Sequence, residues 1–194
     1  MITTAQEYFA NLDILKNINP PAYAILPSAE NTYSIDIDSR TINAPEFLSI
    51  ETDHKSETIY FEVDRFVDYM DLSHTTCVIQ YINAKNKSKI YPVPFYDIYT
   101  KAGKGKMLFP WCLDAQVAEA AGEVQFSIRF FKIGNILNPN TNKEETVLVY
   151  NLNTLAAKSK VLKGIGDYKP EQDVEYLLKA GEFEILQNQI TQLG

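Results

Sequence analysis

Two stretches of the chain alternate strictly between apolar and polar residues, which is the pattern of a β-strand with one buried face. They span residues 57–66 and 123–132. Because two half-buried strands so far apart need a shared core, these segments anchor the predicted fold. The apolar positions of the alternation are Ile59, Phe61, Val63, Val124, Phe126, Ile128 and Phe130.

Further strands are predicted around these two anchors. They cover residues 33–40, 47–51, 75–82, 89–99 and 146–152. Residues 83–87 have the composition of a hairpin turn. Pro92 and Pro94 remove two amide donors, so the strand over 89–99 is expected at a sheet edge. Several short strands separated by turns favour a mostly β fold, a β-sandwich or a barrel.

Three other segments between the strands are expected to lack strand structure. Residues 101–106 are predicted to form a basic turn, and residues 115–121 a helical turn. Residues 134–143 are rich in asparagine and are expected to form a long loop.

The two ends of the chain have helical periodicity instead. Thr4 and Glu7 form a capping box that begins a predicted amphipathic helix over residues 4–17. From residue 170 to residue 194 the apolar period again becomes helical. The resulting division is a helical arm over 1–30, a β domain over 31–166 and a C-terminal helix over 167–194.

The apolar stripes of these two helices are the predicted protein-interaction residues, because a single domain has limited means of covering them. In the tail they step by three and four residues, as in a coiled-coil seam, although the stretch is shorter than two heptads. A tail helix folded on its own domain is an equal alternative. The stripe residues are Phe9, Leu12, Leu15, Val174, Leu177, Leu178, Phe183, Ile185, Leu186, Ile190 and Leu193.

Charge and composition narrow the function classes. A net charge of −7 on 194 residues argues against nonspecific binding to nucleic acid or to an anionic membrane. No apolar run approaches the ~20 residues of a membrane span, and the first residues do not have the pattern of a secretion signal. Cys77 and Cys112 lie in strand-like surroundings, where free buried thiols are favoured over a disulfide or a metal site.

No motif in the sequence predicts catalysis, a metal or a cofactor. His54 and His74 do not have metal-ligand spacing and are interpreted as turn residues. Trp111 is interpreted as a core residue, with a sugar-stacking platform as the alternative. Several aspartates could bind calcium or act in hydrolysis, but exposed strand faces and turns explain them better. These acids are Asp36, Asp38, Asp64, Asp68 and Asp71.

Three segments, over residues 45–98, 106–133 and 149–165, contain a set of structural motifs. The motifs are Asp71-Leu72-Ser73, the Trp111 and Leu113 pair, and the strand from Gly122 to Ile128. As a set, the segments resemble uncharacterised proteins of bacteriophages and prophages of Gram-positive bacteria, and the N-terminal domain of phage baseplate upper proteins. The resemblance spans residues 45–165, roughly two thirds of the chain, and no catalytic residue is attached to its motifs.

The resemblance implies an immunoglobulin-like antiparallel β-sandwich that attaches a fibre or receptor-binding element to a virion, as an oligomer with a helical linker. The expected protein is therefore a non-enzymatic virion component, assembled in the host cytoplasm. Its expected partners are other copies of itself and other phage structural proteins. The N-terminal arm departs from the baseplate pattern, so baseplate, neck and head all remain open. A carbohydrate-binding module is the main alternative, and a hydrolase is the third hypothesis.

Overall fold

The computed structural model describes residues 28–165, and these residues form a mostly β structure in which the regular elements are strands and one short 3₁₀ helix. Residues 28–163 belong to one compact unit. The predicted helices at the two ends of the chain lie outside the described residues, so they stay predictions.

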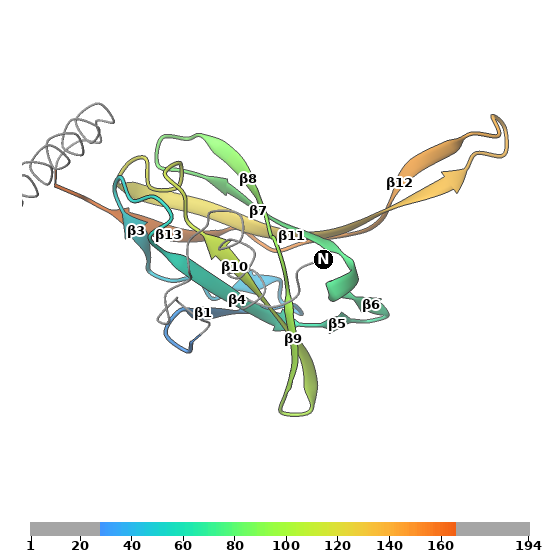
Figure 1. Ribbon diagram of the computed structural model, residues 1–194, viewed down its shortest axis with the longest axis horizontal. Helices are drawn as coiled ribbons and strands as arrows, with labels where there is room; N and C mark the ends of the chain where they lie inside the picture. Colours follow the sequence, from blue (N-terminus) through green and yellow to red (C-terminus); the bar gives the residue numbers. More distant parts are fainter. Residues whose placement is uncertain (1–27, 166–194) are drawn as a thin grey trace, which may run out of the picture. The chain divides into compact units, whose positions relative to one another are not determined.

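Two curled sheets face each other across the core (Figure 1). We name the first of them sheet I. Its spatial order is β2 (Thr41–Ile42), β1 (Thr32–Asp36), β4 (Thr58–Asp64), β10 (Lys104–Cys112) and β9 (Asp97–Lys101).

The second sheet, sheet II, contains the longest strand among the described residues, β11, at its centre. Its order is β3 (Phe47–Ile50), β13 (Ala157–Leu162), β11 (Gly122–Leu137), β7 (Thr76–Ile82) and β8 (Ser88–Pro92), and β12 (Glu144–Asn153) pairs with the far end of β11. A small hairpin is formed by β5 (Phe66–Val67) and β6 (Met70–Asp71), which lead into the 3₁₀ helix η1 (Leu72–His74).

Aromatic side chains from both sheets form the core. Phe61 of β4 packs against Phe126 of β11 with ring centroids 5.9 Å apart, and Phe109 of β10 meets Phe130 at 5.8 Å. Trp111 lies fully buried, 5.0 Å from the Phe126 ring. The two segments that anchor the predicted fold, β4 and the first half of β11, therefore contact each other through their apolar positions.

The structure corrects one predicted strand and the predicted antiparallel arrangement. The single strand predicted over 89–99 is two strands in different sheets, because the chain crosses from β8 in sheet II to β9 in sheet I. The predicted edge position holds for β8, which pairs only with β7 among the described strands. The sandwich is also not purely antiparallel, since β1 runs parallel to β4 and β3 runs parallel to β13.

Strand β10 was not predicted, and its Pro110 explains why. A proline is expected outside the interior of a sheet because it has no amide to donate. In the structure β10 pairs with β4 along Lys106–Cys112, but with β9 only as far as Leu108. Pro110 therefore has a strand neighbour on one side, and the lost donor costs no ladder hydrogen bond on the other.

Candidate interaction surfaces

The eleven predicted interaction residues lie outside residues 28–165, so the structure does not place them. The candidate surfaces within the described part of the chain are different ones. They are the projecting end of the β11–β12 hairpin and a shallow hollow on the outer face of sheet II.

The predicted acidic candidates are dispersed in the structure. Asp36 accepts hydrogen bonds from the amides of Asp38 and Ser39, at 3.0 and 3.2 Å, as in an Asx turn. Asp64 pairs with Lys106, whereas Asp71 pairs with Arg65. Within residues 28–165, no cluster of three or more His, Cys, Asp or Glu side chains could hold a metal ion.

Asp71 has a clear structural role. Its carboxylate accepts two hydrogen bonds from Arg65, at 3.0 Å from Nε and 2.8 Å from Nη2, and caps η1 through the Ser73 amide. The hydrogen bond from Arg65 is the main reason that the pKa of Asp71 is lowered to about 2. These contacts fix the base of the small β5–β6 hairpin and account for the predicted Asp71-Leu72-Ser73 motif as an architectural element.

The end of the β11–β12 hairpin extends beyond the sandwich (Figure 1). We call residues 132–150 the hairpin extension. Strand β7 pairs with β11 only as far as Phe131, so from Lys132 onward β11 has β12 as its one partner among the described strands. The loop predicted over 134–143 is thus shorter than expected: β11 continues to Leu137 and β12 begins at Glu144, so the loop is confined to residues 138–143.

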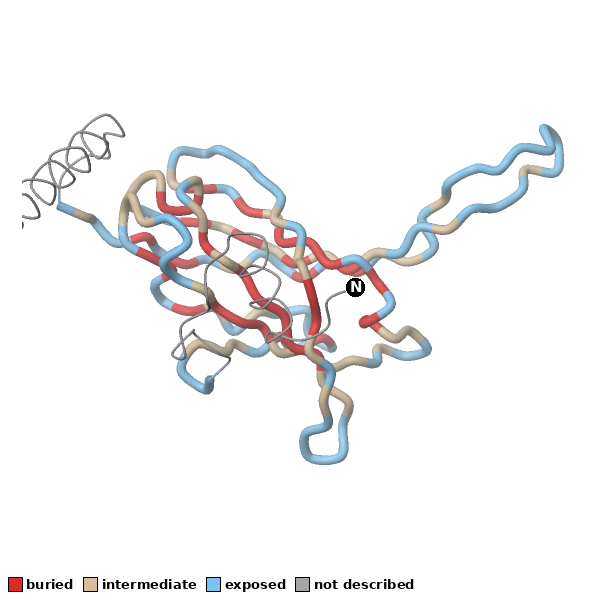
Figure 2. Tube along the Cα trace, viewed as in Figure 1, coloured by how far each residue is buried: buried red, intermediate tan, exposed pale blue. Residues whose placement is uncertain are grey.

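Apolar side chains project from both faces of the hairpin extension, and almost all of it is exposed or half-exposed (Figure 2). Ile133 and Leu148 are directly paired and are each 54% exposed. The opposite face carries Ile136 and Val149 at 52% and 55%. An isolated two-stranded ribbon is marginally stable in water, and contiguous exposed apolar surface makes this hairpin a candidate interaction surface.

A β-bulge lies at the base of the hairpin extension. Lys132 pairs with Tyr150 and Ile133 pairs with Leu148, which leaves Val149 as the extra residue. A Cβ added to Gly134 would lie 2.8 Å from Val149 Cγ2, so glycine leaves the space that the valine side chain occupies. Bulges increase strand twist, and this one sets the direction in which the hairpin extension leaves the sheet.

The tip of the hairpin extension is ordered by Asn138. Its amide donates to the Lys143 carbonyl at 2.9 Å, and its side chain donates to Glu145 at 2.6 Å. It also accepts from the Asn140 amide at 2.9 Å. The asparagine-rich segment, whose composition predicted a loop, therefore forms a tight, hydrogen-bonded turn between two strands.

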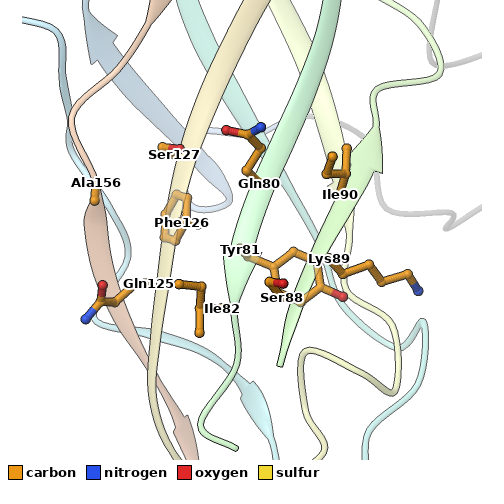
Figure 3. A pocket seen from close by; sticks show the side chains of 10 residues that line it. All are labelled: Gln80, Tyr81, Ile82, Ser88, Lys89, Ile90, Gln125, Phe126, Ser127 and Ala156. Carbon is orange, nitrogen blue, oxygen red and sulfur yellow. The ribbon is translucent and has the colours of Figure 1, made fainter. Parts of the chain in front are cut away.

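The second surface is a hollow of about 670 Å³ on the outer face of sheet II, which we call the outer-face hollow (Figure 3). Tyr81 and Phe126 are buried toward the core, so their strand neighbours face outward here. Ile82 and Ile90 are 43% and 53% exposed. The lining residues are Gln80, Tyr81, Ile82, Ser88, Lys89, Ile90, Gln125, Phe126, Ser127 and Ala156.

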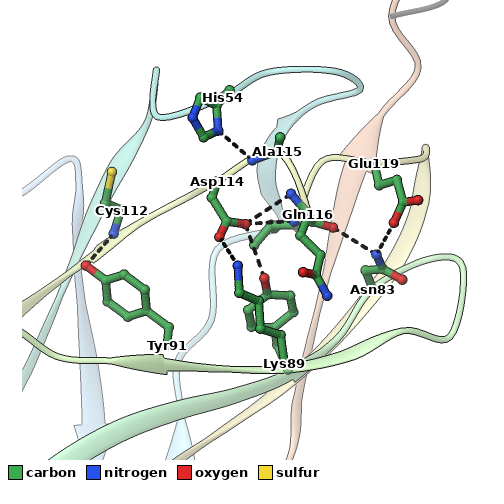
Figure 4. Close-up of polar contacts among 11 residues, drawn as sticks. His54, Asn83, Lys89, Tyr91, Cys112, Asp114, Ala115, Gln116 and Glu119 are labelled. Atoms are coloured by element: carbon green, nitrogen blue, oxygen red, sulfur yellow. Dashed lines mark hydrogen bonds and ion pairs between the residues drawn. The ribbon is translucent and has the colours of Figure 1, made fainter.

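A polar cluster beside this hollow is organised by Asp114 (Figure 4). The Asp114 carboxylate accepts from Lys89 Nζ at 2.8 Å, from Tyr81 Oη at 3.2 Å and from the amide of Val117 at 3.2 Å. His54 Nδ1 accepts from the Ala115 amide at 2.9 Å. Together these bonds hold the segment between β10 and β11 in place, where a helical turn was predicted and turns and bends are found.

The ionisation of this cluster suits a structural role. Burial raises the pKa of Asp114, but hydrogen bonds from Lys89 and from the Val117 amide outweigh it, and the pKa is lowered overall. Burial, together with the Asp114 charge, raises the pKa of Tyr81. A carboxylate that stays charged and a phenol that stays protonated are poorly suited to proton transfer near neutral pH.

Two of the remaining sequence candidates, Trp111 and Cys77, belong to the core, whereas Cys112 is only half-buried, contrary to the prediction of two buried thiols. Trp111 is fully buried, which excludes the sugar-stacking alternative and confirms the core interpretation. Cys77 and Cys112 are unbridged, and burial raises the pKa of the Cys77 thiol well above its ordinary value. Within residues 28–165, no helix has the length and apolar character needed to cross a bilayer.

Sequence reasoning predicted the second strand of the hairpin extension, over 146–152, where Val147, Leu148 and Val149 are consecutive. It missed the continuation of β11 beyond residue 132. The alternation is incomplete there, because apolar residues occupy both faces and are interrupted by Gly134 and Asn135.

Comparison with known proteins gives no relative from which to transfer a function. No family model matches the chain, and no curated protein matches it. What can be said of its function therefore depends on the sequence resemblance and on the surfaces described above.

Proposed function

We propose that the chain is a non-enzymatic structural protein of a phage particle, an adaptor whose β-sandwich attaches a fibre or receptor-binding element through oligomerisation. The observation that carries the proposal is the hairpin extension, whose two faces expose Ile133, Leu148 and Val149 by more than half. A single free copy leaves this apolar surface in water, whereas an assembly covers it.

The sequence resemblance supports the same proposal. It aligns the phage pattern with β10 and the first half of β11, and both strands supply core residues here. An immunoglobulin-like sandwich is the proposed fold type. The two facing sheets agree with it, and the parallel β1–β4 and β3–β13 pairs are additions to that pattern.

The particle association can be tested directly. Phage particles purified from a host that carries the gene are expected to contain the chain in fixed stoichiometry to the other tail or head proteins, measured by quantitative mass spectrometry. Neighbouring capsid, portal and tail genes are the expected genomic context. Purified particles that lack the chain would refute the proposal.

The predicted helical stripes call for a separate test. If the tail contributes to assembly, deletion of residues 170–194 lowers the number of copies in the assembly, calculated from the mass measured by light scattering. An unchanged number of copies would remove the predicted role of the tail stripe, for example that of Leu186 and Ile190, and leave the hairpin extension as the assembly element.

The carbohydrate-binding alternative has less support. Exposed aromatic rings are the usual platform for a sugar, and Tyr69 and Phe66 of the small β5–β6 hairpin segment are exposed. However, the two rings that line the outer-face hollow, Tyr81 and Phe126, are 2% and 1% exposed. A glycan array without a hit is the expected result, and a specific hit would favour this alternative.

A further inference from the structure

We propose that the hairpin extension of one copy docks its Ile133–Leu148 face into the outer-face hollow of a second copy. The proposal rests on the proposed function in one respect, that the chain assembles, and it names the two surfaces that meet. The partner is therefore another copy of this chain, not a different virion protein.

The hairpin extension cannot fill the hollow of its own copy. Both surfaces lie on β11, with Ser127 as the nearest lining residue of the hollow and Ile133 at the start of the apolar face. Ile133 lies six residues of extended strand beyond Ser127, which is roughly 20 Å at ~3.4 Å per residue. Because β11 is one continuous strand through both regions, it holds the two surfaces apart, and contact between them requires a second molecule.

The size of the hairpin extension suits a small protein interface. One face of residues 132–150 enters the hollow, which is fewer than the ~20–30 residues that one partner contributes to a standard interface, so the contact lies at the small end of the range. The hollow offers a matching strip, with Ile82 and Ile90 exposed beside an uncharged floor of Gln80, Gln125 and Ser127. Leu137 lies on the same face as Ile133 and lengthens the apolar strip along the ribbon.

The charges of the two surfaces favour this partner over a strongly charged one. Residues 133–142 and 146–150 carry no charged side chain. The face that contains Ile133 has one charged residue, Glu144, which is exposed and pairs with Leu137 at the end next to the turn. Among the residues that line the hollow, Lys89 is the one charged side chain, and its Nζ already contacts Asp114 Oδ2 at 2.8 Å. Docking with Glu144 left in water at the rim therefore buries no unpaired charge, which is the main electrostatic cost of forming an interface.

The geometry also determines the symmetry of the assembly. The two contacting surfaces are different parts of the molecule, so the contact is heterologous. Each copy gives its hairpin extension to one neighbour and receives that of another. Such contacts close into a ring or continue as a filament, and both arrangements suit a component that repeats around the axis of a particle.

The test uses the full chain and two kinds of variant. Replacing Ile133 and Leu148 by threonine keeps strand propensity but removes apolar surface, and Ile90→Lys introduces a charge at the rim of the hollow. Each variant is expected to raise the dissociation constant of the assembly by on the order of 30-fold, measured by analytical ultracentrifugation. Ile98→Thr, at a 44% exposed position of β9 in sheet I, is the matched control and keeps the wild-type constant.

Mixing the two variants gives the decisive result. One partner retains an intact hollow and the other an intact hairpin extension, so the mixture is expected to form a 1:1 dimer and no larger species in native mass spectrometry. A wild-type chain that stays monomeric at high concentration would overturn the inference, as would variants that assemble like the wild type. A mixture that stays monomeric would overturn it too.

The outcome is separable from that of the proposed function. If the chain self-associates as described but is missing from purified particles, the proposed function fails and the docking of the two surfaces stands. If the chain is present in particles but does not self-associate, the inference fails. In that case the hairpin extension binds another virion protein.

Discussion

The two halves of β11 are one continuous strand in two different environments. Within Gly122–Phe131 the strand pairs with β7 on one edge, from Gln125 onward, and with β13 and then β12 on the other edge. Val124, Phe126 and Ile128 are 1% exposed or less. From Lys132 to Leu137 it has a single neighbour, β12, among the described strands. In this second half Ile133 and Ile136 are more than half exposed.

This difference separates residues that hold the domain together from residues that are available to join it to something else. The first half has one apolar face, which the opposite sheet covers. The second half has apolar side chains on both faces, and neither face is covered by a sheet within residues 28–165. The same side-chain chemistry therefore contributes to folding in one half and, in the proposed assembly, to association in the other.

The largest expected effect distinguishes the two halves with the same substitution. Ile128→Ala opens a cavity at a fully buried position and is expected to lower the free energy of unfolding by about 2–4 kcal/mol. Ile133→Ala, at a 54% exposed position, is expected to change it by less than about 0.5 kcal/mol. Urea denaturation at low protein concentration measures both, and equal effects would contradict the division of β11.

A second prediction concerns the small β5–β6 hairpin. An ion pair between Arg65 and Asp71 holds this hairpin in place. Asp71→Asn is expected to cost about 1.5 kcal/mol at pH 7, because a two-point charged contact is lost from a site where the carboxylate side chain is 15% exposed. Asp38→Asn, at an exposed turn, is the matched control and is expected to change the stability by less than about 0.5 kcal/mol.

The same ion pair predicts a pH dependence. The folded pKa of Asp71, about 2, lies below the ordinary value of 3.8, so its stabilisation is complete above about pH 4. It is lost as the pH falls toward 2. The difference between the wild type and Asp71→Asn should therefore shrink over this interval in urea titrations. A difference that stays constant down to pH 2 would contradict the assigned role.

A third prediction concerns the bulge at the base of the hairpin extension. In Gly134→Ala the new Cβ would lie 2.8 Å from Val149 Cγ2, so the ribbon must shift there. We expect amides in 133–150 to exchange with deuterium about 5-fold faster, corresponding to about 1 kcal/mol of local opening free energy. Adding Val149→Ala should restore most of the protection, and no rescue would mean that this contact is not the cause.

The smallest expected effect is at the junction of the two halves. Arg129 lies 4.7 Å from the centroid of the Phe131 ring and donates to Asn151 Oδ1 at 2.6 Å. Arg129→Gln removes the cation–π contact and is expected to cost about 0.5 kcal/mol in urea denaturation. A cost above about 2 kcal/mol would show that the junction belongs to the core.

Sequence reasoning located the strands in which apolar and polar residues alternate, a pattern that indicates one buried face. The pattern around Phe61 predicted β4, and that around Cys77, Ile79 and Tyr81 predicted β7. It did not separate β8 from β9, because membership in one sheet or the other depends on packing between distant segments. It also missed β10, where Pro110 is acceptable only because β9 has already ended.

The candidate site was less accessible to prediction than the fold. Burial of one face of a strand imposes a period of two on its apolar residues. After Phe131 neither face of β11 is buried, and the sequence no longer shows this period. The Asn138 turn has the composition of a loop, and its role in closing a hairpin depends on hydrogen bonds that composition does not specify. The stripe residues of the predicted helices, such as Leu12 and Leu177, lie outside the described residues and stay a prediction.

The continuity of β11 has a mechanical consequence. Because the strand passes without a break from the hairpin extension into the centre of sheet II, a pull on the tip acts along the strand axis. The hydrogen bonds to β7 and β13 lie across that axis. They share the load in shear and do not open one after another, so tension on the hairpin extension is carried directly into the aromatic core.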